Sequence, residues 1–173
     1  DNISKKLSED VEEMEKMLNE YLQFSKSRSY EKTETFSISE LIKLTVFEYG
    51  NRNITTELKE RIYLNGRKNL IKRCLNNLID NSIKYANKIN INLLKNNKNV
   101  IITIDDDGPG IPKKEYGNVF KPFYKINKSR GDSKSSVGLG LSIASDVIKS
   151  HGGNIILDKS PQNGLSVKIL IPF

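Results

Sequence analysis

Two short motifs in this 173-residue sequence combine residue types that can hold a nucleotide and a metal ion. Asn77 and Asn81 are four residues apart, so in a helix their amide oxygens lie on the same face. Oxygen ligands placed on one face of a helix can bind the same metal ion. Asp106 is followed by Gly108 and Gly110, which let the backbone approach a planar ligand while the carboxylate accepts a hydrogen bond from an amino group. The two motifs therefore predict a site for a nucleobase and a metal-bound group.

A third motif, Gly138 and Gly140, stands at the start of a strongly periodic apolar helix, and helix N-termini attract phosphate groups. A basic cluster lies between this motif and the second one, and Glu115 and Asp132 oppose its charge. The cluster consists of Lys113, Lys114, Lys121, Lys125, Lys128, Arg130 and Lys134. A local field of that sign beside a phosphate site suits a triphosphate better than a long polyanion. The sequence has no zinc-binding spacing, helix-turn-helix pattern or RNA-binding aromatic motif, so we expect no nucleic-acid partner.

The composition agrees with a globular nucleotide-binding module. Hydrophobic residues make up 36% of the chain and charged residues 28%, and the length suits one domain with an appendage. No apolar run in the sequence approaches the length of a membrane span. The single cysteine, Cys74, excludes an intrachain disulfide, and its place among helical apolar positions predicts a core residue in a reducing compartment.

The elements that must position these motifs follow from the hydrophobic periodicity. Three amphipathic segments predict helices, the first with Ser39 as its N-cap, and seven alternating segments predict strands. The expected helices cover residues 39–48, 68–86 and 139–149, and the expected strands 35–38, 54–58, 61–64, 89–93, 100–104, 154–157 and 165–171. The fold class is α+β: a two-layer sandwich with helices on one face of a mixed, mostly antiparallel sheet, preceded by a long N-terminal helix. Residues 113–137 carry no periodic core pattern, which is typical of a functional lid.

The leading segment, residues 1–28, predicts a helix with a heptad seam. The seam residues alternate spacings of four and three: Leu7, Val11, Met14, Leu18, Tyr21 and Ser25. A lone helix cannot bury such a seam, so we expect it to pair with another copy of the chain, or alternatively to pack on its own domain. Residues 29–34 are polar and predict a linker to a second unit, residues 35–173.

The motifs together resemble those of bacterial two-component sensor histidine kinases, in the ATP-binding family shared with gyrase B, the MutL mismatch-repair proteins and the heat-shock chaperone ATPases. Residues 76–85 (NNLIDNSIKY) resemble the kinase N box, and residues 106–112 (DDGPGIP) resemble the first glycine box. Residues 119–125 (VFKPFYK) resemble the F box, and residues 138–143 (GLGLSI) the second glycine box. Residues 1–28 resemble, by pattern and position alone, the second helix of the dimerisation and phosphoacceptor domain, here incomplete.

The resemblance implies ATP and Mg²⁺ as ligands. Asn81 would ligate the Mg²⁺ that bridges the phosphates, with Asn77 nearby. Asp106 would accept a hydrogen bond from the adenine amino group and so select ATP over GTP. The other expected ATP-site residues are Lys84 and Arg130 for phosphate charge, Tyr85 beside the nucleotide, Gly108, Gly110, Gly138 and Gly140 for backbone room, Ile111, Phe120, Phe123 and Leu141 as apolar floor and lid hinges, and Tyr124, Lys125 and Leu139.

The implied reaction is transfer of the ATP γ-phosphoryl group to a histidine. We expect that phosphoacceptor histidine upstream of Asp1, so the sequence given would hold no catalytic residue and would not autophosphorylate alone. Hydrolytic relatives carry Glu at position 77, whereas an amide cannot take a proton from water. The alternatives are an ATP-binding regulatory module without kinase activity and a serine kinase of the anti-sigma type, which Asn77 and the leading helix disfavour.

The resemblance also implies partners and a location. We expect a homodimer and a cognate response regulator, in a membrane-anchored full-length protein whose cytoplasmic part includes this domain at the bacterial inner membrane. One departure concerns Lys125, which stands where many relatives carry Arg and offers a point charge instead of a planar fork. His151 lies in the last turn before Gly152 and Gly153, which predicts a structural role.

Overall fold

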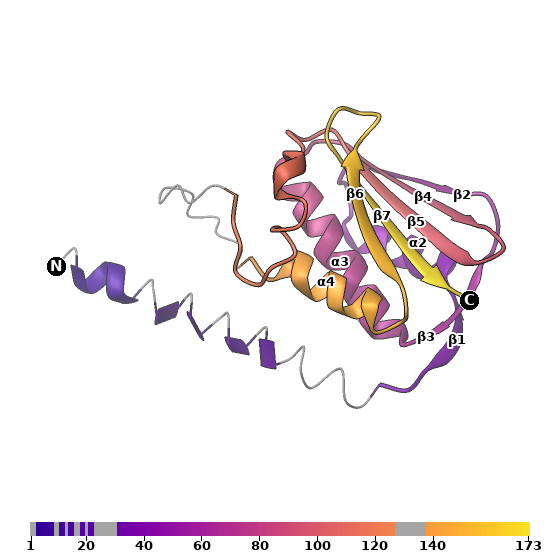
Figure 1. The fold of residues 1–173 in the computed structure, drawn as a ribbon, viewed down its shortest axis with the longest axis horizontal. Helices are drawn as coiled ribbons and strands as arrows, with labels where there is room; N and C mark the ends of the chain where they lie inside the picture. The colour runs from indigo at the N-terminus through magenta and orange to yellow at the C-terminus, as the bar shows by residue number, and fades with distance from the viewer. Residues whose placement is uncertain are drawn as a thin grey trace.

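A five-stranded sheet forms the centre of the fold, in the order β2, β4, β5, β7 and β6 (Figure 1). These strands span, in that order, Ile54–Leu58, Ile89–Lys95, Asn99–Asp106, Leu165–Pro172 and Asn154–Lys159. β2 pairs with β4 in parallel, whereas the β4–β5, β5–β7 and β7–β6 pairs are antiparallel. The computed structural model describes residues 3–8, 11–12, 14–15, 18–19, 21–22, 31–126 and 138–173. The expected mixed, mostly antiparallel sheet is confirmed.

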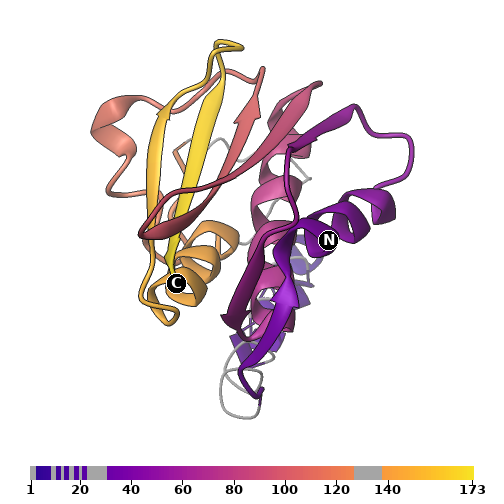
Figure 2. The same cartoon turned by 90° about the vertical axis from the view of Figure 1, so that its right-hand side faces the viewer.

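Three helices cover one face of this sheet: α2 (Ile38–Glu48), α3 (Lys68–Tyr85) and α4 (Gly140–Lys149) (Figure 2). Side chains of a strand alternate between the two faces, and on β5 every second residue is buried toward the helices. The core between the layers is mainly aliphatic and includes Cys74, as expected. Its least exposed members include Ile38, Ile42, Leu70, Leu75, Leu78, Ile91, Leu93, Ile102 and Ile169. The two-layer α+β architecture is therefore confirmed.

The start of the second unit differs in detail from the prediction. β1 (Glu34–Ser37) pairs antiparallel with β3 (Tyr63–Gly66) in a separate two-stranded sheet. Ser37 is the N-cap of α2, because its hydroxyl accepts a hydrogen bond from the Glu40 N–H. The prediction of Ser39 as the cap is wrong. The Ser39 hydroxyl is turned inward, where it donates to the Glu60 carbonyl at 3.0 Å and accepts from the Ile62 N–H at 2.9 Å.

The predicted lid, residues 113–137, is described as far as residue 126. It begins with a 3₁₀ helix, Lys113–Glu115, and Val119 is 7% exposed within the core cluster. The first part of this segment is therefore packed on the domain and has some regular structure, which the sequence pattern did not predict. Residues 127–137, including Arg130, lie outside the described residues.

The leading helix remains a prediction, because the structure describes parts of it. Residues 3–8, 11–12, 14–15, 18–19 and 21–22 are helical, and the rest of residues 1–28 lies outside the described residues. The described seam side chains are 49–66% exposed: Leu7, Val11, Met14, Leu18 and Tyr21. A single copy of the chain thus leaves this apolar seam unburied.

His151 joins the end of α4 to the start of α3. Its Nε2 accepts a hydrogen bond from the Arg67 N–H at 3.0 Å, and its Nδ1 donates to the Val147 carbonyl at 2.7 Å. A Cβ on Gly66 would lie 3.1 Å from the imidazole ring, so the ring is closely packed. This pattern needs a neutral ring, and burial lowers the pKa of His151 below its ordinary value, with the charge of Arg67 acting in the same direction. The structural role expected for His151 agrees with these contacts.

Protonation of His151 should weaken the fold. A histidine whose pKa is lower in the folded than in the unfolded chain stabilises the fold above the unfolded value of about 6.5. That contribution is lost as the pH falls from about 6.5 through the folded-state pKa. We expect chemical denaturation to report a free energy of unfolding that decreases from about pH 7 to about pH 5.

The His151→Gln variant is the matching control. It should be less stable at neutral pH by about 1–3 kcal/mol, because the partly buried Arg67 N–H loses its partner, and its stability should depend less on pH across this range. If the variant kept the pH dependence of the native chain, a group other than His151 would be responsible for it.

Candidate functional site

Asn77 carries a buried polar atom without a partner. Its Nδ2 is shielded from solvent and makes no hydrogen bond with any described residue. A Cβ on Gly140, the first residue of α4, would lie 3.8–3.9 Å from atoms of Asn77, so this asparagine adjoins the α4 N-terminus. Leaving a buried polar group unpaired costs about 1–3 kcal/mol, which a bound ligand can offset. Asn81 is half-buried one turn further along the same face of α3, as expected.

Asp106 lies at the end of β5 and is 4% exposed. Its Oδ1 accepts hydrogen bonds from the N–H groups of Gly108 at 3.0 Å and Leu165 at 2.9 Å. Its Oδ2 accepts one from the Ser82 hydroxyl at 3.1 Å. A carboxylate has about four acceptor positions, so within the described part of the chain one position remains open. The side chain can therefore accept one further donor and is otherwise fixed.

Three glycines lie close to Asp106 or just after it in sequence: Gly108, Gly110 and Gly164. A Cβ on Gly108 would lie 3.0 Å from the Tyr85 carbonyl oxygen, so a side chain there would press on the end of α3. Gly110 has a φ of +70°, a left-handed conformation that L side chains rarely adopt. A Cβ on Gly164, in the β6–β7 turn, would lie 2.3 Å from the backbone and side-chain oxygens of Asp106. The carboxylate is therefore bordered by backbone on two sides.

Asp107 fixes the turn between α3 and β4 against the segment that carries Asp106, Gly108 and Gly110. Its Oδ1 accepts hydrogen bonds from the N–H groups of Asn87 at 2.8 Å and Lys88 at 2.9 Å, and its own N–H donates to the Lys88 carbonyl. These bonds, first that of Lys88 and then that of Asn87, lower the pKa of Asp107 below its ordinary value. The wall of the site beside Tyr85 is thereby tied to the strand that carries Asp106.

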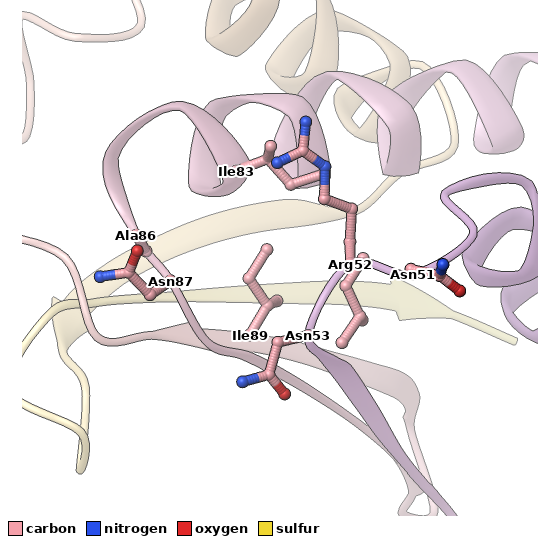
Figure 3. Close-up of a pocket in the computed structure, with 8 residues that line it drawn as sticks. Asn51, Arg52, Asn53, Ile83, Ala86, Asn87 and Ile89 are labelled. Atoms are coloured by element: carbon pink, nitrogen blue, oxygen red, sulfur yellow. The ribbon is translucent and has the colours of Figure 1, made fainter.

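A separate hollow of about 190 Å³ lies between the α2–β2 loop and the C-terminal end of α3 (Figure 3). It is lined by Asn51, Arg52, Asn53, Ile54, Ile83, Ala86, Asn87 and Ile89. Figure 3 shows the three asparagine amide groups pointing away from its centre, while the Arg52 side chain extends from the loop toward α3, beside Ile83. No residue expected in the nucleotide site lines this hollow, so it is distinct from the site built around Asn77 and Asp106.

A backbone hydrogen bond joins Phe123, inside the predicted lid, to Gly138, the residue just after it. The Phe123 N–H donates to the Gly138 carbonyl at 3.0 Å, and a Cβ on Gly138 would lie 3.0 Å from the Phe123 carbonyl carbon. Both residues have a left-handed backbone, with φ of +63° and +79°. That conformation costs a residue such as Phe123 about 1–3 kcal/mol, so the surrounding contacts must hold it in place. The expected hinge role of Phe123 stays a prediction.

Tyr124 is bonded within the lid. Its hydroxyl donates to the Glu115 carboxylate, which also accepts from the Asn118 amide. The bond between Tyr124 and Glu115 is the largest cause of the raised pKa of the tyrosine and of the lowered pKa of the glutamate. The tyrosine hydroxyl thus braces the lid segment, and a nucleotide contact through it stays a prediction.

The other expected site residues differ in how far they are exposed. Lys84 and Tyr85 are exposed at the end of α3, with the Lys84 Nζ 5.1 Å from the centroid of the Tyr85 ring. Lys125 is half-buried. The apolar residues pack against the core, Leu139 being 3% exposed and the others partly buried: Ile111, Phe120 and Leu141. Their expected role as an apolar floor stays a prediction.

Sequence reasoning missed three contributors to the Asp106 environment. Gly164 stands between the expected strands 154–157 and 165–171, where the sequence pattern predicts no role in the site. Ser82 lies inside the N-box segment, and its hydroxyl could have been placed on the face of α3 toward β5 by its helical position. Leu165 contributes its backbone N–H, and the residue type does not reveal this contact because every residue except proline carries that group.

Comparison with known families adds an independent observation. Residues 66–173 match the family described as "Histidine kinase-, DNA gyrase B-, and HSP90-like ATPase". This match covers more than half of the chain and includes Asn77, Asn81, Asp106 and Gly140.

Individual relatives agree with this match. The chain is 28% identical over 176 residues to the sensor histidine kinase GtrS of Pseudomonas aeruginosa, covering 99% of this chain and 36% of that protein. It is 33% identical over 110 residues to the sensor histidine kinase CpxA of Escherichia coli, covering 63% of this chain and 24% of that protein. The chain thus spans about a quarter to a third of the length of these relatives.

Two solved structures share the fold. The catalytic domain of the histidine kinase ThkA has a TM-score of 0.69 and 28% identity, covering 82% of this chain and 95% of that chain. The mycobacterial sensor histidine kinase MprB has a TM-score of 0.70 and 25% identity, covering 82% of this chain and 97% of that chain. Both likenesses support the two-layer architecture.

The contact between Gly140 and Asn77 gives a test of the site. In the ligand-free chain a Gly140→Ala side chain fits, because the nearest atoms of Asn77 would lie 3.8–3.9 Å away. Alanine favours a helix over glycine by up to about 1 kcal/mol, so the melting temperature should stay the same or rise. The added methyl group fills space between Asn77 and the helix N-terminus, so the affinity for ATP with Mg²⁺, from calorimetry, should fall about tenfold or more.

Gly117→Ala is the matched control. In the described structure no other atom lies within 4 Å of a Cβ on Gly117, and its φ is not left-handed. This variant should keep the affinity of the native chain. Equal affinity in Gly140→Ala would place the phosphates away from the α4 N-terminus.

Proposed function

The chain belongs to the family of histidine kinase-, DNA gyrase B- and HSP90-like ATPases, and on that premise we propose that it transfers the ATP γ-phosphoryl group to a histidine. It is the ATP-binding catalytic part of a sensor histidine kinase. The observation that carries this proposal is the buried Asn77 Nδ2 atom, which has no hydrogen-bond partner among the described residues and lies beside the first residue of α4. The names of its relatives, sensor histidine kinases, support it further.

The base end of the site is the surroundings of Asp106. The open acceptor position of its carboxylate suits the 6-amino group of adenine, whereas a 6-oxo group would set acceptor against acceptor. Gly108 and Gly110 keep side chains away from the plane of the base. These features support ATP over GTP as the bound nucleotide.

The phosphate end lies between α3 and the start of α4. Asn81 and Asn77 would hold Mg²⁺, and the bound ion would neutralise phosphate charge. Across the described ranges no three His, Cys, Asp or Glu side chains come together as a metal cluster. A Mg²⁺ ion bound largely through phosphate oxygens and water needs few protein ligands, so an amide pair fits this chemistry. Lys84 and Lys125 would add positive charge, with Lys125 acting as a point charge.

The residues at the phosphate end favour transfer over hydrolysis. An amide at position 77 cannot remove a proton from water, so the site lacks the general base of hydrolytic relatives. Both ring nitrogens of His151 are engaged in hydrogen bonds, which argues against this residue as the phosphoacceptor. The nucleophile would come from a histidine on another segment, with catalysis by positioning and charge neutralisation. A regulatory module that binds ATP without kinase activity is the alternative, and none of the named relatives favours it.

The full-length protein would act as a homodimer that passes the phosphoryl group to a cognate response regulator. The exposed seam of the leading segment supports pairing through a helical bundle, with residues 1–28 as its second helix, residues 29–34 as linker and residues 35–173 as catalytic domain. No helix among the described residues combines the length and the apolar character needed to span a bilayer. A membrane anchor and a cytoplasmic place for this domain are part of the proposal, from the likeness to sensor kinases.

The Asp106→Asn variant tests the base end. In this variant the amide oxygen can take the position of Oδ1 and accept from the Gly108 and Leu165 N–H groups. The amide nitrogen then takes the position of Oδ2, and the Ser82 hydroxyl can rotate to accept from it. The open position then becomes a donor, so calorimetry should show ATP binding weakened by about 1–3 kcal/mol and inosine triphosphate, with a 6-oxo group, favoured relative to ATP. An unchanged ratio between the two nucleotides would place the base elsewhere.

Phosphoryl transfer can be tested with γ-labelled ATP. The chain alone should acquire no acid-labile label, whereas mixing it with a separate polypeptide carrying a histidine-bearing dimerisation helix should label that polypeptide. The Asn77→Asp variant should transfer less phosphoryl group to the polypeptide and release more free phosphate, because a carboxylate can act as a base where the amide cannot. Acid-labile label on the chain alone that disappears in His151→Gln would contradict the proposed nucleophile.

A further inference from the structure

We propose that Ser82 is a positioning residue that sets the nucleobase selectivity of the site by holding Asp106 as an acceptor. The inference rests on the proposed function, because it assigns a role at the base end of that site. Ser82 is 2% exposed, and its hydroxyl donates to Asp106 Oδ2 at 3.1 Å across 24 residues of sequence. A helical serine often bonds to a carbonyl of its own helix, as Ser142 does to Leu139, so the direction of the Ser82 bond is specific to this site.

The two oxygens of Asp106 have different roles. Oδ1 accepts two backbone N–H groups, from Gly108 and Leu165, so both of its acceptor positions are filled. The open position is therefore on Oδ2, the oxygen that Ser82 contacts. Because the hydroxyl takes one side of Oδ2, a ligand donor can approach from the other side alone. Ser82 thus decides where on the carboxylate the base is bound.

The β6–β7 turn fixes the same carboxylate from the opposite side. Gly164 lies so close to Asp106 that a Cβ would meet Oδ1 at 2.3 Å, and this approach brings the Leu165 N–H within 2.9 Å. Asn163, just before it, has a left-handed φ of +73°, which turns the chain into β7. With Oδ1 held by the backbone, Ser82 is the side chain that completes the arrangement.

The hydroxyl also limits how a base can be held. The open position on Oδ2 is an acceptor, so it can take a 6-amino group and would oppose a 6-oxo group. Removing the Ser82 donor leaves two open positions on Oδ2 in place of one, so the amino group is no longer directed to one side of the carboxylate. The ligand class that Ser82 selects is therefore the 6-aminopurine nucleotides.

The experiment compares the dissociation constants of ATP and inosine triphosphate by calorimetry, with Mg²⁺, on the intact chain. Ser82→Ala should lower the preference for ATP about five- to tenfold, the effect of one lost hydrogen bond. Ser82→Thr keeps the hydroxyl and should stay within about twofold of the native preference. Ser39→Ala is the control, because it loses a buried serine that bonds Glu60 and Ile62 and should lower the melting temperature without changing the preference.

Each outcome bears on a different claim. A native preference for ATP that survives in Ser82→Ala overturns the role of Ser82 and leaves the proposed function intact. The same loss of preference in Ser39→Ala also overturns it, since general destabilisation would then be the cause. If the native chain binds neither nucleotide, or binds both equally, the proposed function itself fails. Loss in Ser82→Ala with retention in both other variants supports the inference.

Discussion

The burial of one carboxylate organises this end of the molecule. A buried Asp106 must be surrounded by donors, because an unpaired charge in the interior is far costlier than a paired one. Those donors come from α3, from the turn after β5 and from the start of β7, and they lie up to 59 residues from Asp106 in sequence. The carboxylate therefore has all of these partners only when the central helix and the last strand are both in place.

The rest of the site consists of groups that bind and position. Asparagine amides, glycine turns and the N-terminus of α4 are groups that can bind a nucleotide, and the amide of Asn77 cannot act as a base toward water. Under the proposed function, the acceptor histidine would be supplied by another segment. The chain spans about a quarter to a third of the length of two relatives named as sensor histidine kinases.

Hydrophobic periodicity was sufficient to predict the two layers. The alternation of residues 99–106 indicates a strand with one buried face, and the apolar residues of α3 fall on one face of a helix. Periodicity failed at the start of α2, where Ser37 and Ser39 are both suitable caps and the pairing of β1 with β3 decides between them. Motif residues such as Asn77 and Asp106 were found because their side chains carry the chemistry. The roles of Leu165 and Gly164 depend on backbone atoms brought together by the tertiary fold, which a local pattern cannot show.

The backbone bond between Phe123 and Gly138 has an evolutionary consequence. A loop whose ends are fastened at its base can change length without moving the elements that it leaves. Each doubling of such a loop adds only about 0.6 kcal/mol of closure entropy, far less than the loss of a core contact. A change in chain length between these two residues is therefore expected to leave their backbone bond and the adjoining core in place.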